Sequence, residues 1–339
     1  MTAGGTEATL TLQVTAANSA QVLADIASAD PELARCVAGA PRALATFAAT
    51  MARGIAAAAP NLQEAADSSA LALAAIASAD PELARRVAEV PGALTTLAAT
   101  VAAGAAAPPS CQGAAASSTE VLCYIAWAGP ELARRAAEAP GVLAALVAVL
   151  AASGAAAAPS LQDASRFSAQ TLAVIAGAAP ELARRVAEAP GVLAALVAAL
   201  VVSCVAAAPS LQEAGKASAR ALAALAGADP QLVRRVAEAP GALRALTAAV
   251  NHGGSTGAEA RRALAILKTW AESAGAAART ACGHCGRRAG GATGLRLRVC
   301  AGCNTAHFCN VECQRHAWGG HKAACRVIAA TAGASGGAA

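Results

Sequence analysis

Apolar residues recur along most of the chain at helical spacing, in short segments separated by proline and glycine. In one such segment they follow the spacing i, i+3, i+4 and i+7, and they are Leu193, Leu196, Val197 and Leu200. This spacing predicts a helix with a single apolar face. Such a helix cannot bury its apolar face alone, so we expect neighbouring helices to stack on one another.

The prolines show that these helices repeat with a fixed period. All 15 prolines lie between Pro31 and Pro240, and equivalent prolines are about 50 residues apart. The equivalent prolines are Pro31, Pro81, Pro130, Pro180 and Pro230. The residues around them repeat almost unchanged, as in DPELARRVAEVP and APELARRVAEAP. A period of this length is typical of stacked repeats rather than of a compact single core.

Each repeat predicts three helices. The first has an N-cap, a proline at N1 and an acid in its first turn (Asp80, Pro81, Glu82), and it ends about ten residues later. A second helix follows, as in GVLAALVAAL from Gly191. A loop of Gly, Ala, Pro and Ser then leads to the third helix, as in SAQTLAVIAGA from Ser168. After the last repeat, GAEARRALAILKTWAE predicts a terminal helix that covers the end of the stack.

These repeats resemble the armadillo repeat, through APGVLAALVAAL as the second helix and SAQTLAVIAG as the third. HEAT repeats are the alternative, and three helices per repeat favour the armadillo type. The resemblance covers about residues 10–272. It implies an all-α, armadillo-like right-handed solenoid of five three-helix repeats plus a terminal helix.

In armadillo proteins that bind extended basic peptides, an asparagine recurs on the third helix. The corresponding residues here are Asp25, Ala75, Tyr124, Val174, Ala224 and Ile266. None is asparagine, so we do not expect peptide binding of that kind. Binding of a partner to the concave face through apolar contacts remains an alternative. We interpret Tyr124 and Trp127 as residues that fill the core rather than as a partner site.

Composition agrees with helices and raises the question of a membrane span. Hydrophobic residues make up 56% of the chain, only 2% is aromatic, and the mean hydropathy is +0.48. The best candidate, the uncharged run of residues 191–208, has alanine as its commonest residue and lies between two prolines, so we predict no span. The first residues carry no basic segment of a secretory signal. We therefore predict a cytoplasmic or nuclear protein that is not secreted.

Arginine pairs recur on the first helices, and the pairs are Arg85/Arg86, Arg134/Arg135, Arg184/Arg185 and Arg234/Arg235. Glutamates lie three and four residues after all four pairs, and at the same spacing before the first three pairs. These spacings place opposite charges side by side on a helix. The pattern favours an exposed, self-neutralised face over a nucleic-acid-binding stripe.

Seven of the 11 cysteines lie in the last sixty residues. With one histidine they form four pairs: Cys282-x2-Cys285, Cys300-x2-Cys303, Cys309-x3-Cys313 and His321-x3-Cys325. Eight thiol and imidazole ligands suit two tetrahedral zinc ions. Disulfides are the alternative, but the cysteine number is odd and a histidine completes the pattern. Spacing alone leaves open which pairs share an ion.

This segment closely resembles the MYND-type zinc finger. Besides the four ligand pairs, this chain has Phe308, Gln314, Trp318 and the His321-Lys322 step where that family has the same residue types. Two features depart from the family: Ala317 stands where an acid is common, and the gap from Cys285 to Cys300 is long and glycine-rich. Within that gap, Leu295, Leu297 and Val299 alternate with arginines and predict a half-buried strand.

The family's cross-braced topology implies two ligand sets. They are Cys282, Cys285, Cys309 and Cys313 for the first zinc, and Cys300, Cys303, His321 and Cys325 for the second. Both ions are then fully ligated, with no position for water, so we predict structural zinc. We interpret His284, His307 and His316 as surface or packing residues.

MYND fingers bind short proline-containing peptides, and the resemblance implies that Gln314 and Trp318 contact the peptide. Nucleic acid is the alternative partner, because eight Lys/Arg and one acid between Arg279 and Arg326 sum to a formal +7. Two zinc ions with seven thiolates contribute −3 and lower this attraction.

No SET domain, phosphate loop or acid/base cluster is visible. We predict a non-enzymatic, zinc-binding adaptor: repeats (10–272) that hold one protein partner, a linker (273–281), a MYND finger (282–325) that holds another, and a flexible tail (326–339).

Overall fold

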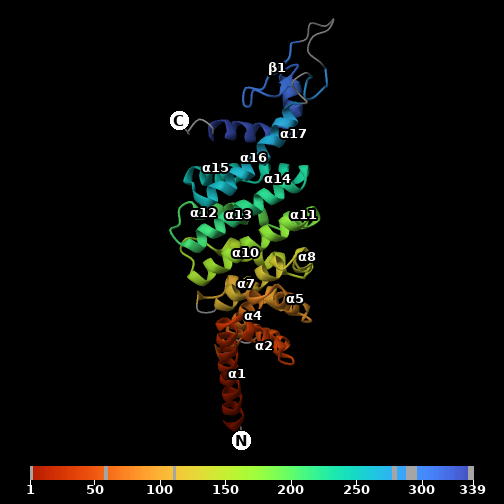
Figure 1. Ribbon diagram of the computed structural model, residues 1–339. Coiled ribbons are helices and arrows are strands. Elements are labelled where there is room, and N and C mark those ends of the chain that lie inside the picture. The colour runs from red at the N-terminus through yellow and green to blue at the C-terminus, as the bar shows by residue number, and fades with distance from the viewer. Residues whose placement is uncertain (1–2, 57–59, 110–111, 277–280, 288–295, 335–339) are drawn as a thin grey trace. The chain divides into compact units, whose positions relative to one another are not determined.

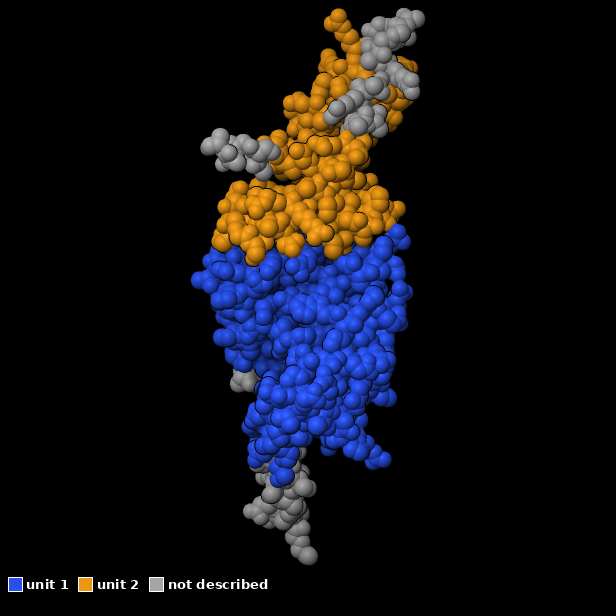
Figure 2. Space-filling view, viewed as in Figure 1, with its two compact units in different colours: residues 1–221 blue, residues 222–339 orange. Residues whose placement is uncertain are grey.

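The computed structural model describes residues 3–56, 60–109, 112–276, 281–287 and 296–334, most of them helical (Figure 1). The chain divides into two compact units, unit 1 (residues 1–221) and unit 2 (residues 222–339; Figure 2). The short first helices are α2 (Pro31–Gly39), α5 (Pro81–Glu89), α8 (Pro130–Glu138), α11 (Pro180–Glu188) and α14 (Pro230–Glu238). The second helices are α3 (Ala43–Ala56), α6 (Ala93–Ala106), α9 (Val142–Ala152), α12 (Val192–Ser203) and α15 (Ala242–His252). The longer helices are α1 (Ala3–Ala29), α4 (Pro60–Ala79), α7 (Gly113–Trp127), α10 (Pro159–Ala178), α13 (Pro209–Ala228), α16 (Gly254–Ala276) and α17 (Val311–Ala334).

The first helices begin and end as their sequence predicts. The Asp80 side chain accepts a hydrogen bond from the Glu82 backbone N–H at 2.8 Å, and Pro81 occupies the first helical position. After α5, Gly92 adopts a left-handed φ of +77°, which turns the chain sharply into α6. The two helices meet at 91°, so each first helix lies across the second.

The third helices are longer than the apolar pattern predicts. Helix α10 begins at Pro159 rather than at Ser168, because Ala158 is extended and Pro159 takes the N1 position. The predicted apolar residues Leu172 and Ile175 lie fully buried on this helix. The Gly/Ala/Pro loop is therefore shorter than the composition suggests.

Stacking of successive repeats buries one recurring set of apolar positions in unit 1. Ile76, Ile125 and Ile175 occupy equivalent positions on neighbouring third helices and are each 0% exposed. Their equivalent on α1, Ile26, is 38% exposed, because no helix in the described part of unit 1 covers that side. Burying an isoleucine of this kind stabilises the fold by roughly 1.5–3 kcal/mol.

Small residues let the second and third helices approach closely. A Cβ atom on Gly104 of α6 would lie 2.2 Å from the Cβ atom of Ala115 on α7, and Gly54 meets Ala66 in the same way at 2.4 Å. Real Cβ atoms do not approach this closely, so these positions accept only glycine without a shift of the helices.

In three of the arginine pairs, the second arginine joins neighbouring repeats. Arg86 Nη2 donates to the carbonyl oxygen of Ala38 at 2.8 Å, Arg135 Nη2 to that of Ala88 at 3.1 Å, and Arg185 Nε to that of Ala137 at 3.0 Å. The acceptors lie in the last turn of the preceding first helix, where backbone carbonyls lack helical partners.

The predicted self-neutralised face therefore describes only part of the arginine pattern. Arg85 pairs with Glu82 and Glu89 on its own helix, as expected. Arg134, however, reaches Glu181 of the next repeat at 2.9 Å, and three of the second arginines donate to backbone carbonyls of the preceding repeat. Sequence spacing within one helix cannot show a partner 47 residues away.

Unit 2 contains the last helices and the cysteine-rich segment. A two-stranded antiparallel sheet, β1 (Arg298–Val299) and β2 (His307–Phe308), pairs Arg298 with Phe308. The predicted strand is thus much shorter than expected, Val299 is exposed, and Leu295 lies outside the described residues.

The ends of the last two helices differ from the predicted linker and tail. Helix α16 continues to Ala276, and α17 continues through the predicted tail to Ala334. Val327 and Thr331 are buried there, so packing rather than local composition extends α17. Residues 277–280 and 335–339 lie outside the described part of the chain.

No single helix among the described residues has the length and apolar character to cross a bilayer. Three pairs of successive helices are long and apolar enough only when each pair is counted as one segment. Each of these pairs is bent by 82–91°.

The close approach of α6 and α7 predicts opposite outcomes for two Gly→Ala substitutions. Gly104→Ala should lower the free energy of unfolding by about 1–3 kcal/mol, because the helices must separate. Gly177→Ala, at an exposed position of α10 with no atom within 4 Å of the new Cβ, should be neutral or raise stability by up to about 1 kcal/mol. Urea unfolding of both variants measures the difference, and an unchanged Gly104→Ala variant would contradict the packing.

The bond between repeats predicts that Arg135→Met lowers the free energy of unfolding by about 1 kcal/mol, because the Ala88 carbonyl loses its donor. Arg85→Met is the matched control, since Arg85 makes only exposed pairs within its helix and should have little effect. Equal losses in the two variants, measured by urea unfolding, would show that the second arginine has no special role.

Candidate metal centre

Two similar turns present the first two cysteine pairs. After Cys285, Gly286 has a φ of +73°, and its N–H donates to the Cys282 carbonyl at 3.0 Å. After Cys303, Asn304 has a φ of +54°, and its N–H donates to the Cys300 carbonyl at 2.9 Å. Glycine and asparagine tolerate this left-handed conformation, which folds each Cys-x2-Cys segment so that both thiols lie on one side.

The other two pairs depend on β2 and on α17. Cys309 follows β2 directly, and the Asn310 side chain accepts from the Cys313 N–H at 2.8 Å, which caps the start of α17. His321 and Cys325 are four residues apart on α17 and therefore lie on one face of the helix.

The structure brings the eight residues together in two sets of four. Cys282, Cys285, Cys309 and Cys313 form one cluster, and Cys300, Cys303, His321 and Cys325 form the other. Within each cluster the four ligand atoms lie within 4.8 Å of one another. The first and third pairs thus meet, as do the second and fourth, in the cross-braced arrangement that the resemblance implies.

The distances within the clusters fit zinc. Cys285 Sγ and Cys309 Sγ are 3.4 Å apart, Cys300 Sγ and Cys325 Sγ are 3.9 Å apart, and Cys303 Sγ lies 3.5 Å from His321 Nε2. A tetrahedral zinc with Zn–S bonds of about 2.3 Å places its sulfur ligands about 3.8 Å apart. The two clusters fit two structural zinc ions, because each supplies a full set of four ligands.

The pKa values of the clustered thiols also favour a bound cation. Burial opposes ionisation of Cys282, yet backbone hydrogen bonds from Cys285, His284 and Cys309 lower its pKa to about 6. Desolvation and the neighbouring thiols Cys285 and Cys282 raise the pKa of Cys309 to about 12. The first thiolates in a cluster therefore resist ionisation of the remaining thiols, and a bound divalent cation removes this repulsion.

The second cluster shows the same need for a cation. Desolvation and the charges of Cys300 and Cys303 raise the pKa of Cys325 to about 12. Burial lowers the pKa of His321, which favours the neutral imidazole that ligates metal.

Several neighbours hold the second cluster in place. The Thr305 hydroxyl donates to Cys303 Sγ at 3.1 Å, and Gln314 Nε2 lies 3.8 Å from Cys300 Sγ. The His321 ring meets the edges of buried Phe308 at 5.6 Å and of Trp318 at 5.9 Å between ring centroids. Sequence reasoning missed Thr305, since a threonine two residues after a ligand carries no distinctive spacing.

The two residues predicted to contact a peptide have different surroundings. Trp318 is 40% exposed on α17, with one ring edge against His321. Gln314 is half-buried and directs its amide toward Cys300. The other histidines lie outside both clusters: His284 stacks on His316 at 5.1 Å, and His307 Nδ1 lies 3.1 Å from the Thr305 carbonyl oxygen.

In unit 1 the aromatic pair is not a core filler. Trp127 is 53% exposed, and its ring lies 6.2 Å from the half-buried ring of Tyr124. The Tyr124 hydroxyl donates to Glu120 at 3.2 Å. Our interpretation of the pair as buried packing is therefore wrong for Trp127, because this side of α7 faces solvent.

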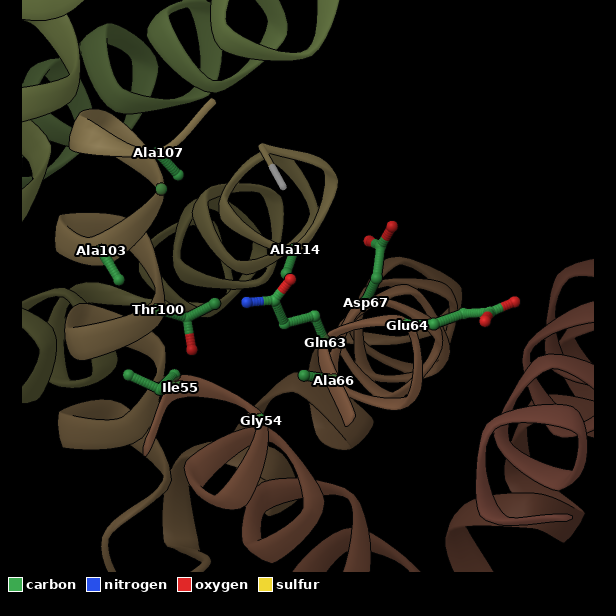
Figure 3. Close-up of a pocket in the computed structure, with 11 residues that line it drawn as sticks. Gly54, Ile55, Gln63, Glu64, Ala66, Asp67, Thr100, Ala103, Ala107 and Ala114 are labelled. Carbon is green, nitrogen blue, oxygen red and sulfur yellow. The ribbon is translucent and has the colours of Figure 1, made fainter. Parts of the chain in front are cut away.

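Unit 1 also contains a cavity of about 420 Å³ among α3, α4, α6 and α7 (Figure 3). Its walls are mostly alanine and glycine, with Gln63 and Thr100 as polar groups. Glu64 and Asp67 lie at its margin, and burial together with the Glu64 charge raises the pKa of Asp67. Among the described residues it has no group of three potential metal ligands.

Comparison with known proteins agrees with both halves of the chain. The family model of the MYND finger matches residues 282–325. A designed armadillo repeat protein shares 22% identity, covers 76% of this chain and 98% of its own, and superposes with a TM-score of 0.57. A second one, solved with the peptide (KR)4, shares 24% identity over 76% of this chain and 98% of its own, with the same TM-score. An engineered protein shares 27% identity over 75% of this chain and 92% of its own, with a TM-score of 0.59. No curated protein matches.

The repeats have an armadillo-like fold, and the two clusters have the ligand sets of a zinc finger. The finger is of the MYND type, and it occupies residues 282–325. The predicted fold class is confirmed, whereas the count of five repeats stays a prediction.

Zinc analysis tests the two clusters. Purified protein should contain about two zinc ions per chain, and Cys309→Ala or Cys325→Ala should lower this to about one or fewer. Cys36→Ala is the control, because this exposed thiol of unit 1 belongs to neither cluster. A strong chelator should unfold the finger while most helical circular dichroism persists. A wild-type content near one ion would contradict the cross-braced arrangement.

Proposed function

We propose that this protein is a non-enzymatic adaptor in the cytoplasm or nucleus. The MYND finger (282–325) binds short proline-containing peptides, and the repeats (10–272) bind a second protein, with residues 273–281 as the linker. The seven clustered cysteines and one histidine ligate two structural zinc ions. A reducing compartment suits this assignment, because the ligands are free thiols.

The observation that carries the peptide function is the position of Trp318. Its helix is anchored on the zinc side by His321 and Cys325, so the exposed indole is held in a fixed orientation. A rigid, half-exposed tryptophan offers a large apolar surface at low entropic cost, which is typical of binding hot spots. Gln314, one turn earlier on the same helix, retains a carbonyl oxygen for a peptide N–H.

The repeats offer a separate surface for a partner. Glu120, Tyr124 and Trp127 lie at i, i+4 and i+7 on α7, and Trp127 is the most exposed aromatic residue among those described. A designed armadillo repeat protein holds the peptide (KR)4. Because this chain lacks the asparagines of such peptide-binding proteins, we assign its partner contact to the aromatic pair instead.

Nucleic acid is the second candidate, favoured by the arginines and lysine of the finger. Seven thiolates beside two zinc ions contribute −3 to the same small domain, which weakens its attraction for phosphate. Peptide binding therefore has the stronger support.

A peptide array with the zinc-loaded full chain tests the proposal. Trp318→Ala should weaken binding of proline-containing peptides at least about tenfold, because it removes the exposed anchor. Trp127→Ala is the matched control: it removes an exposed tryptophan from unit 1 and should leave this binding unchanged. Salt-sensitive binding of DNA or RNA without any proline-containing hit would favour the nucleic-acid function.

A further inference from the structure

One face of α17 combines the exposed tryptophan with positive charge. Four exposed residues lie along one side of this helix: Arg315, Trp318, Lys322 and Arg326. They share a side because successive members are three, four and four residues apart. We call these four residues the basic face of α17. Its orientation is set from the other sides, where His321 and Cys325 join the second cluster and Val327 is fully buried.

An arginine from the repeats adjoins this face. Arg234 Nη2 of α14 donates to the carbonyl oxygen of Gly319 at 3.0 Å, directly beside Trp318 in the chain. In unit 1 the equivalent Arg134 reaches the following repeat, at Glu181. In unit 2, α17 takes the place of that following repeat as the partner of the first arginine. The basic face thus extends onto the repeat domain.

The charges of the basic face are not neutralised in the way those of the repeats are. Glu312 is the only carboxylate on α17, and no ion pair joins Lys322 or Arg326 to any described carboxylate. Arg85, by contrast, pairs with two glutamates of its own helix. The repeats show what a self-neutralised helix looks like in this chain, and α17 does not follow that pattern.

We propose that the basic face of α17, together with Arg234, binds an acidic segment of the partner protein next to the proline-containing segment on Trp318. This inference rests on the proposed function of the finger. Trp318, Lys322 and Arg326 are each one helical turn apart, or about 6 Å. An extended peptide advances about 3.3 Å per residue, so it would present acids at alternate positions, starting about two residues from the residue on Trp318.

Carboxylates lie next to the basic face of α17 and limit the length of an anionic segment that binds there. Glu238 pairs with Arg234 Nε at 2.8 Å, and Glu312 precedes Arg315 by one turn. The thiolates of the second cluster lie on the inner side of the same helix. A short acidic peptide avoids these negative groups, whereas a continuous phosphodiester backbone meets them.

The test uses the zinc-loaded full chain and fluorescent peptides with one proline-containing core. The core carries Glu-x-Glu, Gln-x-Gln or Lys-x-Lys on either side, and binding is measured by anisotropy at low and high salt. We expect the Glu-x-Glu peptide to bind about fivefold or more tightly than the Gln-x-Gln peptide, with the preference falling as salt rises. The double variant K322Q/R326Q should lose the preference and keep its affinity for Gln-x-Gln.

Charge reversal guards against a trivial loss of folding. K322E/R326E should prefer the Lys-x-Lys peptide, a gain that an unfolded finger cannot produce. Arg262→Gln, which removes an exposed arginine of α16 that is not one of the residues of the basic face, should keep the wild-type preference. Arg234→Gln should reduce the preference in part, and an undiminished preference would overturn the extension of the face onto α14.

The outcomes separate this inference from the proposed function. Equal binding of the Glu-x-Glu and Gln-x-Gln peptides would overturn the acidic partner and leave proline-peptide binding intact. Absence of binding by every peptide would overturn both. An oligonucleotide that binds the wild type, displaces the Glu-x-Glu peptide and is lost in K322Q/R326Q would assign the basic face to nucleic acid instead.

Discussion

Helices α6 and α7 approach so closely that one added carbon on Gly104 would lie 2.2 Å from Ala115, and the rest of unit 1 depends on this spacing. Alanine and glycine bury little area individually, so many short-range contacts must replace a few large side chains. Large apolar residues such as Ile125 and Ile175 recur at equivalent positions of successive repeats and are fully buried. A chain with so few aromatic residues obtains its core from the number of helices stacked rather than from the size of any one cluster.

Arginine supplies the polar counterpart of this stacking. Helix ends leave carbonyl groups without partners, and Arg86, Arg135 and Arg185 each satisfy one in the preceding repeat. The guanidinium group suits this role because it stays charged and its stem is long enough to reach a neighbouring helix. In unit 2, Arg234 makes the same kind of reach to α17, which ties the finger to the last repeat helices. The finger and the last repeat helices therefore lie in one compact unit.

In the finger, a second constraint replaces apolar burial. Thiols held within 4.8 Å of one another cannot all ionise without a cation, so metal binding and folding are one process. His321 and Cys325 of α17 are themselves ligands of the second cluster. Zinc binding therefore decides which side of that helix faces solvent. The exposure of Trp318 follows from zinc ligation on the adjacent face. In the proposed function, peptide binding therefore depends on metal binding through the orientation of a single helix.

The period, the caps of the first helices and the eight clustered residues could be predicted from the sequence, because prolines, Asp80-type caps and cysteine pairs act locally and recur at fixed spacing. The sequence by itself also predicted the armadillo and MYND folds. Tertiary structure decided what depends on contacts between distant segments: the reach of Arg135 to Ala88, the solvent exposure of Trp127 and the bond from Arg234 to Gly319. It also decided that α17 continues to Ala334, since burial of Val327 outweighs a local composition that predicted a flexible tail. Such partners lie tens of residues away, where helical periodicity carries no information.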